Sequence, residues 1–295
     1  MRQQCELPGI APARGGYCLA PGLTFYQRHF DDAAQRALAD EIAEAVLQAP
    51  WFVPRMPRSG RAFSVKMTNC GSLGWVSDRD GGYRYQTVHP VTGMAWPSIP
   101  HLALNAWLAL SSYPHPPEAC LLNFYDSHAR MGLHQDRDEL EFAAPVVSIS
   151  LGDSCCFRYG GLLRSDPAKK LELCSGDILV MGGAARLMFH GVDKIFAGSS
   201  GLLPGGGRIN LTLRRVTRPR PAGTGPRGKA KNLWLRAGCD AGQACRHQGF
   251  GDGQASRSML VLDLDSKGKA VRAGLHRSRR LPFKEFLQSR LLLGR

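Results

Sequence analysis

The sequence predicts a mainly β protein in which helices cover one side of an antiparallel sandwich or jelly roll. Helical periodicity is confined to the part of the chain before Ala119, whereas short apolar runs separated by turn residues fill the part from Ala119 to Val216. Because no helical segment separates those runs, neighbouring strands are expected to be antiparallel. An order of helices first and strands afterwards places the helices against one side of the sheets.

Two helices are predicted. Apolar residues, among them Leu38 and Ile42, recur at helical spacing between residues 31 and 49, and aspartates at the start of this segment can cap it. A second helix is predicted to begin near Pro100, because proline is tolerated in a first turn. The intervening residues 67–96 are rich in turn residues and are not expected to hold a long regular element.

Seven apolar runs account for the predicted strands. They are residues 120–125, 145–151, 155–161, 171–173, 177–183, 187–192 and 208–216. Cys155 and Cys156 are adjacent in one of them, so their side chains are expected on opposite faces of the sheet. The chain has nine cysteines, and neither this odd number nor the adjacent pair is typical of a disulfide framework, so the thiols are expected to be reduced.

The net charge of +14 is concentrated at the C-terminal end. From Arg218 onward there are 17 Lys and Arg against 5 Asp and Glu, which leaves 21 basic and 19 acidic residues for the rest of the chain. Residues 218–295 are therefore predicted to be a basic, largely disordered tail, with short ordered pieces at 259–264 and 283–293. Non-specific binding of phosphate backbones and simple solvation are equal alternatives for this tail.

The chain has no apolar run long enough to span a bilayer and no apolar stretch of a secretory signal at its N-terminus. We therefore expect a cytoplasmic protein that has no contact with membranes.

Candidate metal ligands are His134 and Asp136, which are two positions apart. If they lie on one strand, their side chains share a face. His190, which ends an apolar run on a later predicted strand, supplies a second imidazole. Two histidines and one carboxylate leave three coordination positions open, as in the facial triad of non-haem iron(II) oxygenases. An isolated His-x-Asp also arises by chance on solvated surfaces, so these residues alone do not decide the chemistry.

A later strand strengthens this hypothesis. Arg208, Asn210 and Arg214 share one face, because apolar residues alternate with them. Arginine suits the distal carboxylate of 2-oxoglutarate, since its guanidinium stays charged and offers a planar pair of donors. Asn123 and Tyr125 share a face of an earlier strand and are expected to add hydrogen bonds. The plain alternative is an exposed basic edge strand.

Longer segments resemble the AlkB family of oxidative dealkylation enzymes, and its bacterial DNA-repair branch more than the others. They are LNFYDSHARMGLHQDRDE, PVVSISLG, FRYGGLLRSDP, SGDILVMGGAARLMFHGV and RINLTLR, together with MTNCGSLGW, GYRY and WPSIP. The resemblance extends from about Gly22 to Arg215. It implies an α+β domain of residues 1–217 with a double-stranded β-helix (jelly-roll) oxygenase core, followed by the tail of residues 218–295.

The resemblance also implies the cofactors, which are Fe(II), 2-oxoglutarate as cosubstrate, and O₂. The positions that match the iron ligands are His134, Asp136 and His190. Contacts to 2-oxoglutarate are implied for Asn123, Tyr125, Arg208, Asn210 and Arg214, with either Arg208 or Arg214 binding the distal carboxylate.

Residues 67–96 match the family's nucleotide-recognition lid. The family's lid tryptophan, matched by Trp75, lies against the flipped base, and Asp138 matches a residue near the exocyclic amine. The extra residue of Gly81–Gly82 leaves the exact partner of Tyr83 open. Without the resemblance, these residues would be taken as ordinary packing or surface residues. The residues implied to contact the substrate are Trp75, Tyr83, Asp138, Arg164, Met67 and Thr68, and Asn69 belongs to the same lid.

The implied activity is hydroxylation of the N-methyl carbon of 1-methyladenine or 3-methylcytosine, with release of formaldehyde, succinate and CO₂. The expected partner is alkylated single- or double-stranded DNA, with RNA left open, and the expected state is a monomer. One alternative is a 2-oxoglutarate-dependent demethylase of RNA or protein. Another is an inactive oxygenase fold that binds nucleic acid, although an unused site would not need a complete set of ligands.

Overall fold

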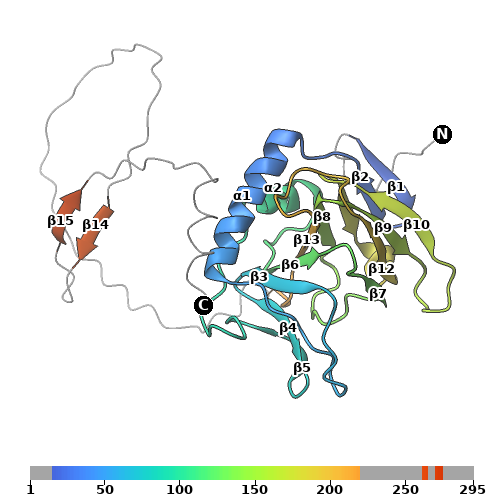
Figure 1. Cartoon of the computed structure of the whole chain (residues 1–295), viewed down its shortest axis with the longest axis horizontal. Helices are drawn as coiled ribbons and strands as arrows, with labels where there is room; N and C mark the ends of the chain where they lie inside the picture. The colour runs from blue at the N-terminus through green and yellow to red at the C-terminus, as the bar shows by residue number, and fades with distance from the viewer. Residues whose placement is uncertain (1–14, 220–260, 265–269, 275–295) are drawn as a thin grey trace, which may run out of the picture. The chain divides into compact units, whose positions relative to one another are not determined.

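The structure, a computed structural model, describes residues 15–219, 261–264 and 270–274 (Figure 1). The chain divides into two units, Met1–Pro226 and Arg227–Arg295. In the second unit, β14 (Val261–Leu264) and β15 (Ala270–Gly274) form an antiparallel hairpin. β14 lies within the predicted ordered piece 259–264, whereas residues 283–293 lie outside the described part of the chain.

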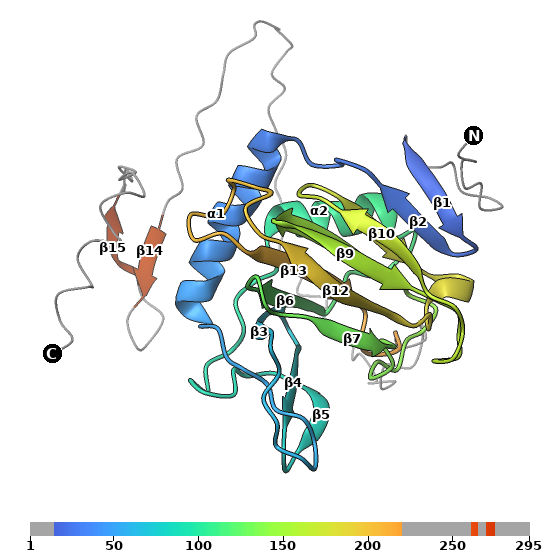
Figure 2. The same cartoon turned by 45° about the vertical axis from the view of Figure 1, so that its right-hand side comes forward.

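The first unit is built from two antiparallel sheets that face each other (Figure 2). The larger sheet has seven strands in the order β1-β2-β11-β8-β13-β6-β3, and the smaller has four in the order β10-β9-β12-β7. The predicted mainly β, antiparallel architecture is confirmed. The strands of the larger sheet are β1 (Gly16–Ala20), β2 (Leu23–Tyr26), β3 (Lys66–Gly71), β6 (Ala119–Tyr125), β8 (Val146–Gly152), β11 (Ile178–Met181) and β13 (Arg208–Arg214). Those of the smaller sheet are β7 (Met131–His134), β9 (Ser154–Tyr159), β10 (Lys169–Leu173) and β12 (His190–Phe196).

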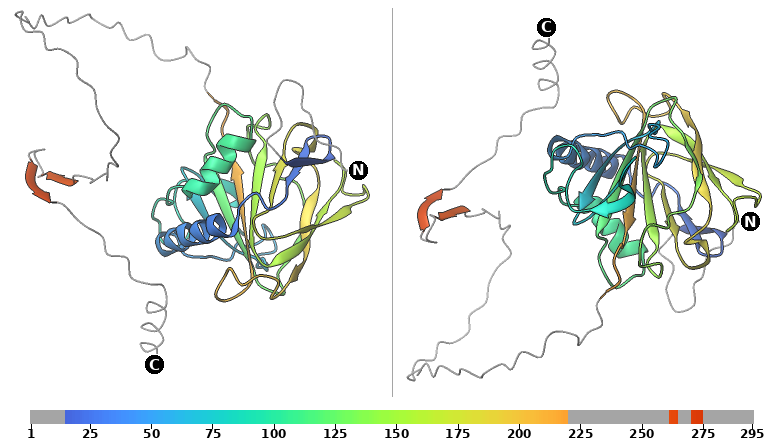
Figure 3. Two further views of the ribbon diagram at one scale, coloured as in Figure 1. Left: turned by 90° about the horizontal axis from the view of Figure 1, so that it is seen from above. Right: turned by 90° about the horizontal axis from the view of Figure 1, so that it is seen from below.

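Both predicted helices are present, α1 (Asp32–Gln48) and α2 (His101–Leu110), and both lie on one side of the larger sheet (Figure 3). The carboxylate of Asp31 caps α1 by accepting a hydrogen bond of 2.8 Å from the amide of Ala34. α1 buries Leu38 and Ile42, and α2 buries Trp107. These side chains pack against the helix-facing side of the larger sheet and form one hydrophobic core. Neither helix in the described part of the chain is long and apolar enough to cross a membrane.

A second hydrophobic core fills the space between the two sheets. Leu121 and Met181 of the larger sheet meet Phe157 and Val192 of the smaller sheet there. Cys155 is fully buried in this core, whereas its neighbour Cys156 is only partly buried, as the strand periodicity predicts. The cavity described below lies between the same two sheets.

Residues 67–96 contain short strands that the sequence did not reveal. β3 pairs with β6 along its whole length, so residues 67–71 belong to the larger sheet and not to a separate lid. β4 (Gly74–Asp78) and β5 (Gly82–Gln86) form a hairpin of their own. The carboxylate of Asp78 accepts hydrogen bonds from the amides of Asp80 and Gly81 at its turn. We call β4 and β5 with this turn the lid hairpin.

Candidate metal and substrate site

A cavity of about 770 Å³ lies between the two sheets and is lined in part by the lid hairpin. Its wall is apolar at Phe63, Met131 and Phe157, and polar around the predicted metal ligands. Strands of both sheets, both strands of the lid hairpin and the loop after β7 all contribute to it.

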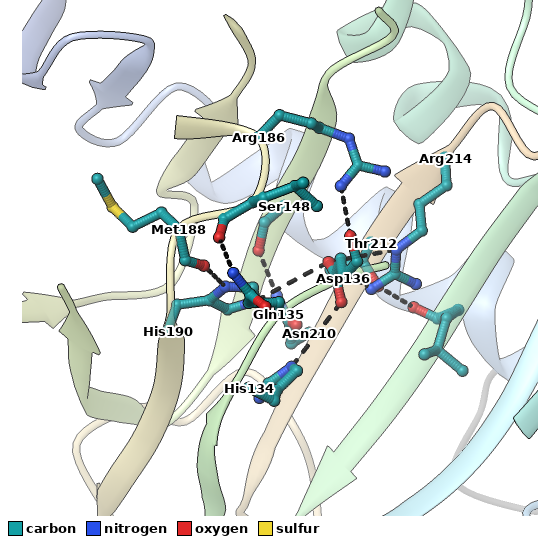
Figure 4. A network of polar contacts seen from close by, with 12 residues as sticks. His134, Gln135, Asp136, Ser148, Arg186, Met188, His190, Asn210, Thr212 and Arg214 are labelled. Carbon is teal, nitrogen blue, oxygen red and sulfur yellow. Dashed lines mark hydrogen bonds and ion pairs between the residues drawn. The ribbon is translucent and has the colours of Figure 1, made fainter. Parts of the chain in front are cut away.

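The three predicted metal ligands come together in this cavity (Figure 4). Each of His134, Asp136 and His190 offers a ligand atom, and these atoms all lie within 4.8 Å of one another. The Nε2 atoms of His134 and His190 are each 3.8 Å from a carboxylate oxygen of Asp136.

The elements that carry these ligands differ from the prediction. Asp136 does not share a strand with His134, because β7 ends at His134 and Asp136 lies in the following loop. His190 does not end a strand but begins β12, because residues 187–189, the start of the predicted run, form a turn and an irregular segment after the 3₁₀ turn at Gly183–Ala185. The two histidines are direct partners across β7 and β12, so the backbone ladder sets the distance between them.

Backbone carbonyls orient both imidazoles. Nδ1 of His134 is 2.9 Å from the carbonyl oxygen of Gly132, and Nδ1 of His190 is 3.0 Å from that of Met188. A carbonyl only accepts, so Nδ1 carries the proton in each ring and the Nε2 lone pair faces Asp136. Burial, followed by the neighbouring His134, lowers the pKa of His190 to about 4. His190 is therefore neutral at pH 7, as a metal ligand must be.

Asp136 is held in the charged form. Burial alone would raise its pKa, but the charge of Arg214 and then the two histidines reverse this and keep the pKa below its usual range. Nη2 of Arg214 donates to Oδ2 of Asp136 at 2.8 Å. Two imidazoles and one carboxylate that line the same cavity are a donor set that fits iron(II) with open coordination positions.

Four of the five predicted 2-oxoglutarate contacts line the cavity, namely Asn123, Tyr125, Asn210 and Arg214. The fifth, Arg208, is 1% exposed and lies opposite Tyr125 across β13 and β6. Its Nη2 donates to Oγ of Ser150 at 2.8 Å. Within the described residues, Nε and Nη1 of Arg208 and Oδ1 of Asn123 have no hydrogen-bond partner. A buried guanidinium with unpaired donors is costly, and its chemistry suits a carboxylate ligand.

The predicted alternation along β13 is confirmed. Ile209 and Leu211 point into the core against the helices, whereas Asn210 and Arg214 line the cavity on the other face. The amide of Asn210 is fixed by donating to Oγ of Ser148 at 2.9 Å and to the carbonyl of Ile149 at 3.0 Å.

Trp75 of the lid hairpin is fixed from three directions. Its indole Nε1 donates to Oδ2 of Asp138 at 2.8 Å. Its ring stacks on Tyr83, with centroids 5.5 Å apart and planes 23° apart, and meets the edge of Phe63. The side-chain amide of Asn69 accepts from the backbone amide of Trp75 and donates to its carbonyl, both at 3.0 Å.

Two further predicted substrate residues line the cavity. Met67 is buried in its wall, and the exposed Arg164 lies at the edge with its guanidinium 5.1 Å from the ring centroid of Phe189. Thr68 does not reach the cavity. Successive side chains of β3 alternate, so Thr68 points away from Met67, is fully buried and donates its hydroxyl to the carbonyl of Ala49 at 2.8 Å.

The sequence did not single out three residues that complete the site. Tyr85, on β5, lines the cavity and donates its hydroxyl to Glu139 at 2.5 Å. Glu139 is buried and lies 3.0 Å from Nη2 of Arg186. The period of two along β5, which puts Tyr85 on the same face as Tyr83, was the available signal for Tyr85.

Comparison with known proteins agrees with this geometry. Residues 22–214 match the family model of the 2OG-Fe(II) oxygenase superfamily. The chain is 51% identical over 198 residues to the alpha-ketoglutarate-dependent dioxygenase AlkB homolog of Caulobacter vibrioides, which covers 67% of this chain and 89% of that protein. It is 40% identical over 202 residues to AlkB of Escherichia coli K12, which covers 67% and 92% respectively.

The fold has a counterpart among solved structures. The structure of OsALKBH1 superposes with a TM-score of 0.58 at 30% identity, over 68% of this chain and 99% of that one. The family match, the two relatives and this fold agree with a cavity that holds two histidines and one aspartate. The chain is thus a 2-oxoglutarate-dependent dioxygenase and belongs to the AlkB family of the 2OG-Fe(II) oxygenase superfamily.

Proposed function

We propose that this enzyme removes methyl groups from 1-methyladenine and 3-methylcytosine in DNA by oxidative demethylation. The observation that carries the proposal is the pairing of the three metal ligands with a stacked lid tryptophan across one cavity. His134, Asp136 and His190 line this cavity together with Trp75 and Asp138. A flat aromatic ring beside a carboxylate suits a base that carries an exocyclic amine.

His134, Asp136 and His190 would hold Fe(II), and the residues along β6 and β13 would hold 2-oxoglutarate. When bound, iron(II) with 2-oxoglutarate and O₂ supplies hydroxylation of an unactivated C–H bond, and the cosubstrate leaves as succinate and CO₂. We assign the distal carboxylate to Arg208, because its buried guanidinium has two nitrogens without a partner among the described residues. Arg214 is already engaged by Asp136, so it lies at the metal end.

The protein's part is to place the methyl carbon and to exclude water. The indole of Trp75 offers a face for the base, and Asp138, which also lines the cavity, holds that indole in position. Hydroxylation of the methyl carbon yields a hemiaminal, which collapses to formaldehyde and the unmodified base. A methylated base that cannot pair normally is also cheaper to extrude from a duplex than a sound one.

The test is formaldehyde release from an oligonucleotide that carries 1-methyladenine, in the presence of Fe(II), 2-oxoglutarate and O₂. The oligonucleotide is supplied as single-stranded DNA, duplex DNA and RNA. We expect release from DNA by the native chain and none by His134→Ala. Turnover of 2-oxoglutarate without any formaldehyde from these oligonucleotides would reject the proposal.

We further propose that residues 1–217 act as the catalytic domain of a monomeric, cytoplasmic enzyme and that residues 218–295 are a separate tail. The excess of basic residues after Arg218 supports an auxiliary contact of this tail with phosphates.

A further inference from the structure

The lid hairpin touches the loop that carries Asp136 at two neighbouring points. Trp75 and Tyr85 are directly opposite each other across β4 and β5, so their side chains leave the hairpin on one face. Trp75 donates to Asp138 at 2.8 Å, and Tyr85 donates to Glu139 at 2.5 Å. Two adjacent residues of the loop therefore hold two paired residues of the hairpin.

Glu139 connects the second of these contacts to the metal ligand. It is 4% exposed and lies between two buried arginines. Its Oε2 accepts from Nη2 of Arg186 at 3.0 Å, and its Oε1 is 3.3 Å from Nε of Arg214. Arg214 donates to Oδ2 of Asp136 at 2.8 Å, and Arg186 donates to the backbone carbonyl of Asp136 at 2.7 Å (Figure 4).

Nε of Arg214 is shared between the two carboxylates. It lies 3.3 Å from Oδ2 of Asp136 and 3.3 Å from Oε1 of Glu139. A guanidinium that is not held elsewhere binds both oxygens of a carboxylate with a planar pair of donors. By holding Nε of Arg214, Glu139 keeps this arginine on Oδ2 and leaves Oδ1 of Asp136 facing His134, 3.8 Å from its Nε2.

We propose that Glu139 is a positioning residue that sets the orientation of the Asp136 carboxylate for the metal, and that Tyr85 couples the lid hairpin to it. The buried network has two positive and two negative side chains, those of Arg186, Arg214, Asp136 and Glu139. Its charges therefore balance, and its members act as a unit. A movement of the lid hairpin that breaks the Tyr85 contact releases Glu139, which loosens Arg214 and Asp136. The coupling to substrate rests on the function proposed above, whereas the role of Glu139 toward the metal does not.

Binding of Mn(II) in the presence of 2-oxoglutarate tests the role of Glu139 without nucleic acid or turnover. We expect Glu139→Gln to weaken Mn(II) binding about 10- to 100-fold, the range found when a group that supports a metal ligand is lost. Tyr85→Phe, which removes one hydrogen bond to Glu139, is expected to weaken Mn(II) binding by about 3- to 10-fold. The matched control is Tyr83→Phe, on the same hairpin, whose hydroxyl donates to the sulfur of Met56 at 3.5 Å and, among the described residues, has no hydrogen bond toward a metal ligand.

Thermal melting of each metal-free variant shows whether it is folded. If Glu139→Gln does not fold, the Mn(II) affinity of Tyr85→Phe is compared with that of Tyr83→Phe to test the proposal. If Glu139→Gln folds, the proposal is overturned when both Glu139→Gln and Tyr85→Phe bind Mn(II) as tightly as the native chain. If Glu139→Gln does not fold, it is overturned when Tyr85→Phe binds Mn(II) as tightly as the native chain.

The coupling to the lid has its own readout. An oligonucleotide with 1-methyladenine is expected to tighten Mn(II) binding to the native chain, and Tyr85→Phe is expected to lose most of this gain. A residue that only stabilised the fold would lower the melting temperature and leave the gain unchanged. Equal gains in both proteins, or none in the native chain, overturn the coupling. Absence of formaldehyde release by the native chain would reject the proposed function. The Mn(II) titrations would still test whether Glu139 supports metal binding.

Discussion

Arg208 touches Ser150 through one nitrogen, at 2.8 Å, and this single hydrogen bond is what holds its buried guanidinium within the described residues. A buried positive charge with two unpaired nitrogens is available for a carboxylate ligand, and it leads to the first prediction.

Arg208→Met is expected to separate stability from cosubstrate binding. Replacing an unpaired buried charge by an apolar side chain of similar length is often neutral or stabilising, so the melting temperature of the ligand-free protein should not fall. Binding of 2-oxoglutarate should weaken by about 100-fold or more, since a buried charge-assisted pair is lost, which costs roughly 3 kcal/mol. Calorimetric titration measures the affinity for 2-oxoglutarate, and thermal melting without 2-oxoglutarate measures the stability. A variant that melts lower and binds normally would show that Arg208 is structural.

Trp75→Ala is expected to raise the KM for a methylated oligonucleotide by about 10- to 100-fold, because one stacked base is worth roughly 1–3 kcal/mol. Trp75→Phe keeps a ring but loses the hydrogen bond to Asp138, so its effect should be smaller. Turnover of 2-oxoglutarate without nucleic acid serves as the control and should be the same in both. An unchanged KM for Trp75→Ala would mean that the base lies elsewhere.

The metal-free protein is expected to lose stability on mild acidification. The pKa of His190 is about 4 in the folded chain and about 6.5 when unfolded, so the unfolded chain binds more protons between these values. The contribution of His190 to the free energy of unfolding is therefore complete above pH 6.5. It declines as the pH falls toward 4, by at most about 3 kcal/mol. Urea unfolding across this range measures it. His190→Gln should flatten the curve, and an equally steep curve for this variant would contradict the assignment.

Thr68→Val is expected to affect the fold and not the substrate. It removes the hydroxyl that bonds to the carbonyl of Ala49 in the core and leaves that carbonyl without this donor, which costs about 1–2 kcal/mol in the free energy of unfolding. The KM for the oligonucleotide should stay unchanged, because Thr68 does not line the cavity. Met67→Ala, one residue earlier and in the cavity wall, is the matched comparison and should change the KM. A higher KM for Thr68→Val would restore its predicted substrate role.

A chain that ends after Pro219 is expected to fold and to turn over a short methylated strand at nearly the native rate. This truncation keeps the contact of Arg218 with the carbonyl of Leu140, at 3.1 Å, and removes most of the positive charge. If the tail binds phosphates, oligonucleotide affinity should fall and depend less steeply on salt. Binding in a salt titration decides this, and loss of the cooperative melt would move the domain boundary.

Local patterns in the sequence predicted the helices and drew attention to three candidate metal ligands, which the structure brings together. Leu38 and Ile42 gave the register of α1, and the spacing of His134 and Asp136 gave the ligand pair even though only His134 lies on a strand. The contact of Tyr85 with Glu139 was not predictable in the same way. The two residues are 54 positions apart, and only the folding of the lid hairpin onto the loop brings them together.

Two other differences between prediction and structure also arise from contacts that only folding brings about. β1 and β2 were not predicted, because they become recognisable as strands only when β2 pairs with β11 of the larger sheet. Thr68 was given a substrate role by its position in a resembling segment, and the side-chain alternation of β3 turned it toward the core instead.

β7 lies at the edge of the smaller sheet and is hydrogen-bonded only to β12, while its last residue is one of the two histidines. The strand is four residues long and has no second neighbour in that sheet. An ion bound by both His134 and His190 would therefore link the edge strand β7 to its neighbour β12. Amide hydrogens of β7 should therefore exchange with solvent much more slowly once iron is present, because the metal would oppose local opening of this edge strand.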